Sequence, residues 1–161
     1  MIVVTDTSTV LNLCCLEQES LLPVIFGTVL APPSVAAEFQ RFASVARRFT
    51  GLSFPAFVEM RAVTRTIASL HQNQRLHHGE REALSLAAEV QADAVLMDER
   101  AGRAAAASLG LRSIGILGIL IHAKSLGLVP AISPLMNCLQ SKAQFWIAPA
   151  LRQQVLASAG E

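Results

Sequence analysis

Two aspartates each follow a short run of apolar residues. Asp6 comes directly after "IVVT" (residues 2–5), and Asp98 comes directly after "AVLM" (residues 94–97). Buried strands of a parallel sheet have this composition, and ligands bind at the edge formed by their carboxyl ends. We therefore expect the two carboxylates to lie close together at that edge. Aspartate is also a favoured N-cap, so the alternative is that each one only caps the helix that follows it.

Two glutamates lie on apolar helix faces, where a charged side chain is unexpected. Glu80 comes four residues before Leu84 and shares the apolar stripe of its helix. Glu38 has Val35 three residues before it and Phe42 four residues after it. A favourable interaction with the helix dipole is the alternative for Glu80, which lies at a helix start. That alternative explains its position along the helix but not the face on which it lies.

A cluster of inward carboxylates needs a source of positive charge. Like charges at close range raise one another's pKa, and burial adds to the rise, so the acids either hold protons or bind cations. Oxygen ligands favour Mg²⁺ or Mn²⁺, and the chain has no His and Cys spacing typical of zinc. Two such ions roughly 4 Å apart can activate a water and stabilise the leaving oxygen of a phosphodiester.

The elements that would position these acids alternate between strand and helix. Thr7 or Ser8 can cap the first helix, and Ser34 can cap a helix that runs through about residue 42. The stretch "GTVLAPPS" (residues 27–34) begins with a second short strand that is ended by two prolines, and residues 57–63 favour a third strand. The elements expected later are helices at 80–90, 98–109, 116–126, 135–142 and 149–159, with strands at 94–97 and 112–115. This alternation predicts an α/β fold with a parallel sheet covered by helices on both faces.

The composition is that of one globular domain. The 161 residues are 52% hydrophobic and 16% charged, so we expect a single domain over residues 1–161 and an apolar surface that favours a homodimer. Net charge is +1, which gives no overall field for binding nucleic acid. No segment has the roughly 18 apolar residues of a membrane span, and no basic region precedes "IVVTD", so we expect a cytoplasmic protein with no membrane contact.

Four stretches together resemble the PIN-domain family. They are "VVTDTSTVLNL" (3–13), "HHGEREALSLA" (77–87), "VLMDERAGRAAAASLGL" (95–111) and "GILGILIHAKSLGLVP" (115–130). The nearest branch is the small prokaryotic group of unknown function that is likened to VapC-type toxins. The resemblance covers nearly the whole chain, and residues 142–161 are similar to the C-terminal helical tail of that branch.

The resemblance implies a three-layer α/β/α fold with a central parallel sheet of four or five strands. It also implies a site that binds Mg²⁺ or Mn²⁺ and hydrolyses RNA. Matched by motif position, the catalytic and metal-binding acids are Asp6, Glu38, Glu80 and Asp98. Ser8 matches the hydroxyl that often accompanies the first aspartate.

The chain departs from the pattern of the toxins at two places. Many toxins have aspartate where this chain has Glu80, and a TxDxDF-like pattern where this chain reads "MDERAGR". Glu99 can therefore replace or assist Asp98. Arg100 and Arg103, three residues apart, can hold phosphates of the substrate, or they can neutralise the neighbouring acids without any nucleic acid.

The leading hypothesis is a divalent-metal ribonuclease that acts as the toxin of a toxin–antitoxin pair. Its partners would be an RNA substrate, a second copy of the chain and a small antitoxin protein. A housekeeping RNA-processing nuclease is a variant with the same chemistry. A noncatalytic module, in which the acids only cap helices and form ion pairs while the chain dimerises, is the alternative from another class.

Overall fold

The computed structural model describes residues 1–161 and contains one parallel sheet. Its strands lie in the order β3-β2-β1-β4-β5, and each neighbouring pair is parallel. The strands are β1 (Ile2–Thr5), β2 (Thr28–Ala31), β3 (Glu59–Met60), β4 (Ala94–Leu96) and β5 (Ser113–Ile114). The predicted α/β class and the predicted parallel sheet of four or five strands are confirmed.

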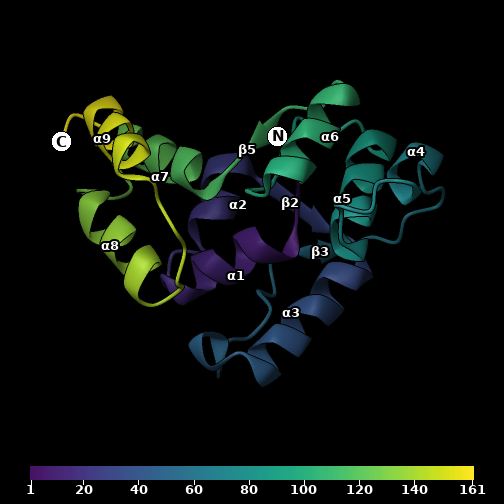
Figure 1. The fold of residues 1–161 in the computed structure, drawn as a ribbon, viewed down its shortest axis with the longest axis horizontal. Coiled ribbons are helices and arrows are strands. Elements are labelled where there is room, and N and C mark those ends of the chain that lie inside the picture. The colour runs from purple at the N-terminus through teal and green to yellow at the C-terminus, as the bar shows by residue number, and fades with distance from the viewer.

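Helices cover both faces of the sheet (Figure 1). They are α1 (Thr7–Cys15), α2 (Leu21–Phe26), α3 (Pro33–Val45), α4 (Ala68–His71), α5 (His78–Glu89), α6 (Arg100–Ser108), α7 (Ile116–Ser125), α8 (Ser133–Ser141) and α9 (Pro149–Ser158), with a 3₁₀ turn η1 (Arg47–Phe49). None of these helices has both the length and the apolar composition needed to cross a lipid bilayer.

The sheet separates two hydrophobic cores because successive residues of a strand point to opposite faces. Val3 of β1 packs into the larger core with residues of α1, α2, α3 and α7. Its neighbour Val4 packs into the smaller core with residues of α5 and α6. The strands are therefore apolar on both faces, which explains their nearly continuous apolar composition.

The sheet register brings the two strand-end aspartates to one edge. Val4 of β1 is paired with Val95 of β4, and the backbone amide of Asp6 donates to the Leu96 carbonyl over 3.0 Å. Asp6 and Asp98 thus leave neighbouring parallel strands at the same end, as the sequence predicted.

Several element boundaries differ from the expected ones. Asp6, rather than Thr7 or Ser8, is the N-cap of α1, since its side chain accepts the Thr9 amide. Helix α3 begins at Pro33, so Ser34 lies inside the first turn, where its buried hydroxyl oxygen has no partner. The expected third strand is only the two-residue β3 at the sheet edge.

The segment after residue 142 packs against the rest of the chain. Ala143, Ile147 and Val155 are buried in the larger core. The side chain of Glu161 accepts the amides of Ile132 and Ser133, which attaches the end of the chain to the start of α8. Residues 143–145, between α8 and α9, thereby pass close to the carboxyl edge of the sheet, where they line the cavity described next.

Candidate active site

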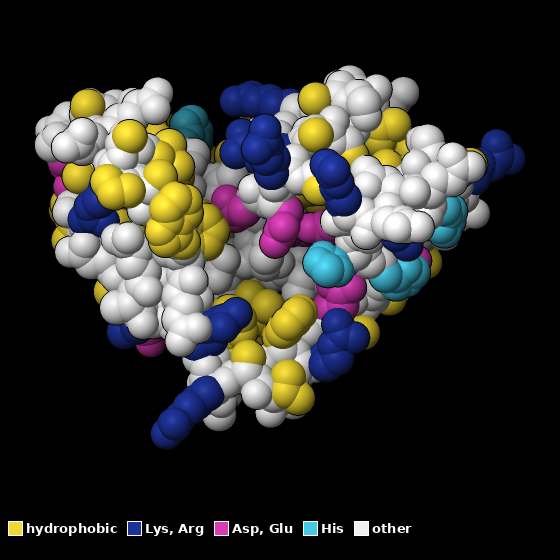
Figure 2. All heavy atoms as spheres, in the orientation of Figure 1, with side chains coloured by type: hydrophobic (Ala, Val, Ile, Leu, Met, Phe, Trp, Pro, Cys, Tyr) yellow, Lys and Arg dark blue, Asp and Glu magenta, His cyan; other side chains and the backbone are white.

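Five carboxylates from separate parts of the chain line one hollow at the carboxyl edge of the sheet. We call this hollow, which has a volume of about 530 Å³, the acidic cavity. Figure 2 shows it as an acidic patch on the floor of the central depression. Its acids are Asp6, Glu38, Glu80, Asp98 and Glu99. The structure therefore brings together all four acids expected from the sequence, together with the neighbouring Glu99.

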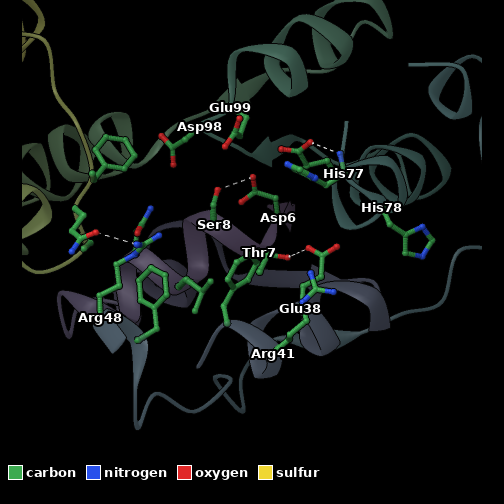
Figure 3. Close-up of a pocket in the computed structure, with 18 residues that line it drawn as sticks. Asp6, Thr7, Ser8, Glu38, Arg41, Arg48, His77, His78, Asp98 and Glu99 are labelled. Carbon is green, nitrogen blue, oxygen red and sulfur yellow. Dashed lines mark hydrogen bonds between the residues drawn. The ribbon is translucent and has the colours of Figure 1, made fainter. Parts of the chain in front are cut away.

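Asp6 is the most deeply placed of these acids. Its side chain is 1% exposed, Oδ1 accepts the Thr9 amide over 2.8 Å, and Oδ2 accepts the Ser8 hydroxyl over 3.2 Å (Figure 3). Burial raises the pKa of Asp6 from 3.8 to about 7, and the charge of Asp98 adds to the rise. The capping alternative is thus correct for Asp6, but the cap accounts for only one of its two oxygens.

Asp98 does not cap the helix that follows it, because Glu99 occupies the N-cap position of α6. Asp98 Oδ1 instead accepts the Ile116 amide of α7 over 2.9 Å, and Oδ2 accepts the Thr9 hydroxyl over 3.3 Å. Burial raises the pKa of Asp98, while these two hydrogen bonds and Arg103 act in the opposite direction. A capping reading for Asp98 is therefore wrong.

The carboxylate of Glu38 lies between two elements other than its own helix. Its Oε2 accepts the Thr7 hydroxyl over 2.7 Å, and its Oε1 accepts the Gly79 amide over 2.9 Å. A Cβ on residue 79 would lie 2.5 Å from Glu38 Oε2, so the glycine is required for this contact. Glu38 thus links α3 to the start of α1 and the start of α5.

Glu80 faces inward from the first turn of α5, as its apolar stripe predicted. It is 7% exposed, and its Oε2 accepts the His77 amide over 2.9 Å. Burial raises the pKa of Glu80, and the charges of Glu99 and Glu38 add to this, while the hydrogen bond from His77 opposes it. The other oxygen of Glu80 accepts no hydrogen bond from the chain.

The acids are held by one hydroxyl-rich segment and by helix N-termini. Thr7, Ser8 and Thr9 each donate a hydroxyl to a different carboxylate, respectively Glu38, Asp6 and Asp98. All four carboxylates also accept an amide at the start of α1, α5 or α7, where the helix dipole is positive. The raised pKa values of three of the acids show that these dipoles do not offset the whole cost of burial.

The donor set fits a hard divalent cation. Every acid of the cavity offers carboxylate oxygen, and burial raises the pKa values of Asp6, Glu80 and Asp98, a cost that a bound cation would offset. No three His, Cys, Asp or Glu side chains lie close enough to hold one ion together. A closed zinc site is therefore a poor fit, whereas Mg²⁺ is commonly held by one or two carboxylates and completes its shell with waters and substrate phosphates.

The residues predicted to bind substrate are divided among different surfaces. Ser8 lines the acidic cavity, whereas Arg103 lines a neighbouring cavity, and Arg100 lines neither. Arg103 lies near Asp98 and lowers its pKa, but the two form no ion pair within 4.0 Å. Substrate contact by these residues stays a prediction.

Two arginines and the segment 143–145 line the acidic cavity without having been predicted from the sequence. Arg41 and Arg48 reach it from α3 and η1. The Arg48 guanidinium donates to Gln144 Oε1 over 3.1 Å and lies 4.8 Å from the centre of the Phe49 ring. No local motif marks these residues, because their role depends on the path by which the C-terminal segment returns.

Comparison with known proteins agrees with this arrangement. A family model described as a PIN domain matches residues 2–161. The chain belongs to the PIN-domain family. A PilT N-terminus domain protein from the hyperthermophilic archaeon Sulfolobus solfataricus P2 has a similar fold, with a TM-score of 0.51 and 18% sequence identity over 74% of this chain and 91% of that one. No curated protein matches the chain.

The PIN-domain family gives a general class of activity. PIN domains have a nuclease-type fold, are generally nucleases and typically use divalent metal ions. The resemblance read from "VVTDTSTVLNL" and the three later stretches is therefore confirmed at the level of the family.

Proposed function

We propose that this PIN domain is a divalent-metal-dependent endoribonuclease that uses Asp6, Glu38, Glu80 and Asp98 as its catalytic acids. The observation that carries the proposal is the meeting of these four carboxylates, from four distant segments, in one cavity. Buried carboxylates lower the stability of a protein unless they are protonated or compensated by positive charge. Four gathered carboxylates that lower the stability of the metal-free protein therefore favour a function in which they bind metal ions.

The side chains have distinct parts in the proposed reaction. Asp6 and Asp98, both hydrogen-bonded to Thr9, would hold Mg²⁺ or Mn²⁺, and waters and substrate phosphate would complete its shell. Such an ion supplies positive charge and Lewis acidity for phosphodiester hydrolysis. The oxygen of Glu80 that accepts no hydrogen bond is available to orient an attacking water, and Ser8 keeps the Asp6 carboxylate in place.

A cleavage assay tests the proposal with a matched control. Purified protein is incubated with end-labelled RNA in Mn²⁺, in chelator, and as the Asp6→Asn variant. We expect cleavage only by the unaltered protein in metal. Asp93→Asn is the control, because Asp93 binds the Ile2 amide at the opposite end of β1 and lies outside the cavity. Cleavage that survives both chelator and Asp6→Asn would refute the assignment.

A second experiment, a metal-binding measurement, separates an enzyme from a noncatalytic module. Isothermal titration with Mn²⁺ should show binding that Asp6→Asn and Asp98→Asn abolish. A module whose acids only cap helices would bind no metal and cleave no RNA.

We further propose that the chain is the toxin of a toxin–antitoxin pair, acts in the cytoplasm and forms a homodimer. Exposed apolar side chains such as Val24, Val45 and Met60 support self-association. Induced expression should arrest growth, whereas expression of Asp6→Asn should not. Sedimentation should give the mass of two chains, and a monomer would refute the homodimer.

A further inference from the structure

A second cavity, of about 720 Å³, lies beside the acidic cavity and along the free edge of the sheet at β5. We call it the β5 cavity. Asp98 and Phe145 line both cavities, so the two adjoin at that point. Its volume falls within the range of about 300–1,000 Å³ that is typical of sites for small ligands.

The charge of the β5 cavity is opposite to that of the acidic cavity. Arg103 and Arg112 line it together with His122, and Asp98 is its one carboxylate. Neither arginine forms an ion pair within the chain. Figure 2 shows basic side chains gathered at the upper end of the central depression, above the acidic patch. Two unpaired guanidinium groups in a concave surface form a suitable site for a phosphate.

Other residues that line the β5 cavity are aromatic and apolar. Trp146, the only tryptophan of the chain, lines it and is 79% exposed. A side chain that anchored the tail would be buried, so the indole of Trp146 does not serve as an anchor. Leu151 and Val155 of α9 line the cavity next to it. An exposed indole beside apolar side chains is suited to stacking with a nucleobase.

We propose that the β5 cavity binds one nucleotide of a single-stranded RNA adjacent to the bond cleaved in the acidic cavity. Arg103 and Arg112 bind its phosphate, and Trp146 stacks on its base. This inference rests on the proposed ribonuclease function, since it places the bound strand across the junction at Asp98 and Phe145. Arg103 would then bind the substrate from the β5 cavity and not from the acidic cavity.

Binding is measured in chelator, where metal-dependent cleavage cannot occur. The probe is a fluorescently labelled decauridine RNA, and its anisotropy gives the affinity at several salt concentrations. We expect Arg112→Gln to weaken binding about tenfold. Loss of one phosphate contact should also reduce the slope of log affinity against log salt by about 0.7. Arg75→Gln is the matched control, because Arg75 is exposed and lines neither cavity.

The stacking role is tested at Trp146 with two substitutions. Trp146→Leu keeps apolar bulk but removes the aromatic face, and we expect it to weaken binding about tenfold. Trp146→Phe should retain most of the affinity. Since the indole is exposed, neither change should alter the fold. Equal affinities for the unaltered protein, Trp146→Leu and Arg112→Gln would overturn the inference.

Failure of this inference can be distinguished from failure of the proposed function. Asp6-dependent cleavage together with unaltered binding by Trp146→Leu and Arg112→Gln would overturn nucleotide binding in the β5 cavity and leave the proposed ribonuclease function standing. Weakened RNA binding in both variants, with no cleavage in metal, would support nucleotide binding in the β5 cavity and refute the proposed ribonuclease function. If Trp146→Leu instead converts a dimer into a monomer without affecting RNA, the cavity is a protein interface and the inference is overturned.

Discussion

The acidic cavity and the β5 cavity share Asp98 and Phe145 but differ in charge and in structural cost. Five carboxylates and two arginines line the first, whereas one carboxylate and two arginines line the second. Three acids of the first, Asp6, Glu80 and Asp98, accept hydrogen bonds at helix starts, and burial raises their pKa values. The cations of the second are exposed. Assembly of the acidic cavity opposes folding, while that of the β5 cavity has little effect on it.

This difference indicates how the two cavities would share a polyanionic substrate. A phosphate is repelled by the acidic cavity until cations occupy it, whereas the β5 cavity attracts a phosphate at all times. Binding and cleavage should therefore respond to different perturbations: binding to salt, and cleavage to metal and pH.

The largest expected effect on cleavage is at the junction of the cavities. In Gly115→Ala the new Cβ would lie 2.6 Å from Asp98 Oδ1, so the carboxylate must move. A shift of about 1 Å in a catalytic group can reduce the rate about 100-fold, and we expect a loss of that size in RNA cleavage. Asp93→Asn is the control, because Asp93 lies outside both cavities at the opposite end of β1. Unaltered cleavage by Gly115→Ala would show that the position of Asp98 is not critical.

The stability cost of the acidic cavity should appear as a pH dependence. The folded-state pKa of Asp6, about 7, lies above its ordinary value of 3.8, so the metal-free protein loses stability as pH rises from about 4 to 7. The loss is roughly 4 kcal/mol. Asp6→Asn should remove this loss and be the more stable protein at pH 8, as urea unfolding at pH 4 and pH 8 in chelator will show. An equal pH dependence in both proteins would contradict the assigned pKa.

Bound metal should restore the stability that is lost when the buried acids ionise. At a concentration about 100 times its dissociation constant, Mn²⁺ should raise the free energy of unfolding by about 2.7 kcal/mol at pH 8. Thermal unfolding with Mn²⁺ and with chelator measures the effect. Asp98→Asn should abolish the gain, whereas Arg112→Gln, in the β5 cavity, should retain it. A gain that survives Asp98→Asn would place the ion elsewhere.

The smallest effect is expected at the wall formed by residues 143–145. Arg48→Gln removes the hydrogen bond to Gln144 and the contact with the Phe49 ring. Because Arg48 is exposed, we expect a loss of less than about 1 kcal/mol in unfolding free energy. Urea unfolding at pH 7 measures it, with the exposed Arg75→Gln as control. A loss of several kcal/mol would mean that the position of this wall depends on Arg48.

The sequence predicted the acids because each has a local signal. Asp6 and Asp98 end strands whose composition is that of buried parallel strands, and parallel strands bring such ends to one edge. Glu38 and Glu80 interrupt apolar helix faces. The hydrogen-bond partners of these acids were harder to predict from the sequence. The amide that binds Asp98, for example, belongs to Ile116, which is eighteen residues away and on another helix.

Features that depend on distant segments had no such signal. The need for glycine at positions 79 and 115 comes from carboxylates that approach them in the folded chain. Helix α2 was not predicted, since it is short and contains Pro23 in its first turn, where proline is tolerated. Arg41, Arg48 and residues 143–145 line the acidic cavity together only in the folded chain, since they come from distant segments.

The central place of β1 in the sheet has a consequence during protein synthesis. Asp6 is synthesised before both flanking strands, the Ile116 amide that binds Asp98 and the wall at 143–145. The acids of a nascent chain therefore stay scattered and solvated until residues 143–145 have been made. The acidic cavity, and any activity that depends on it, can form only after that point in translation.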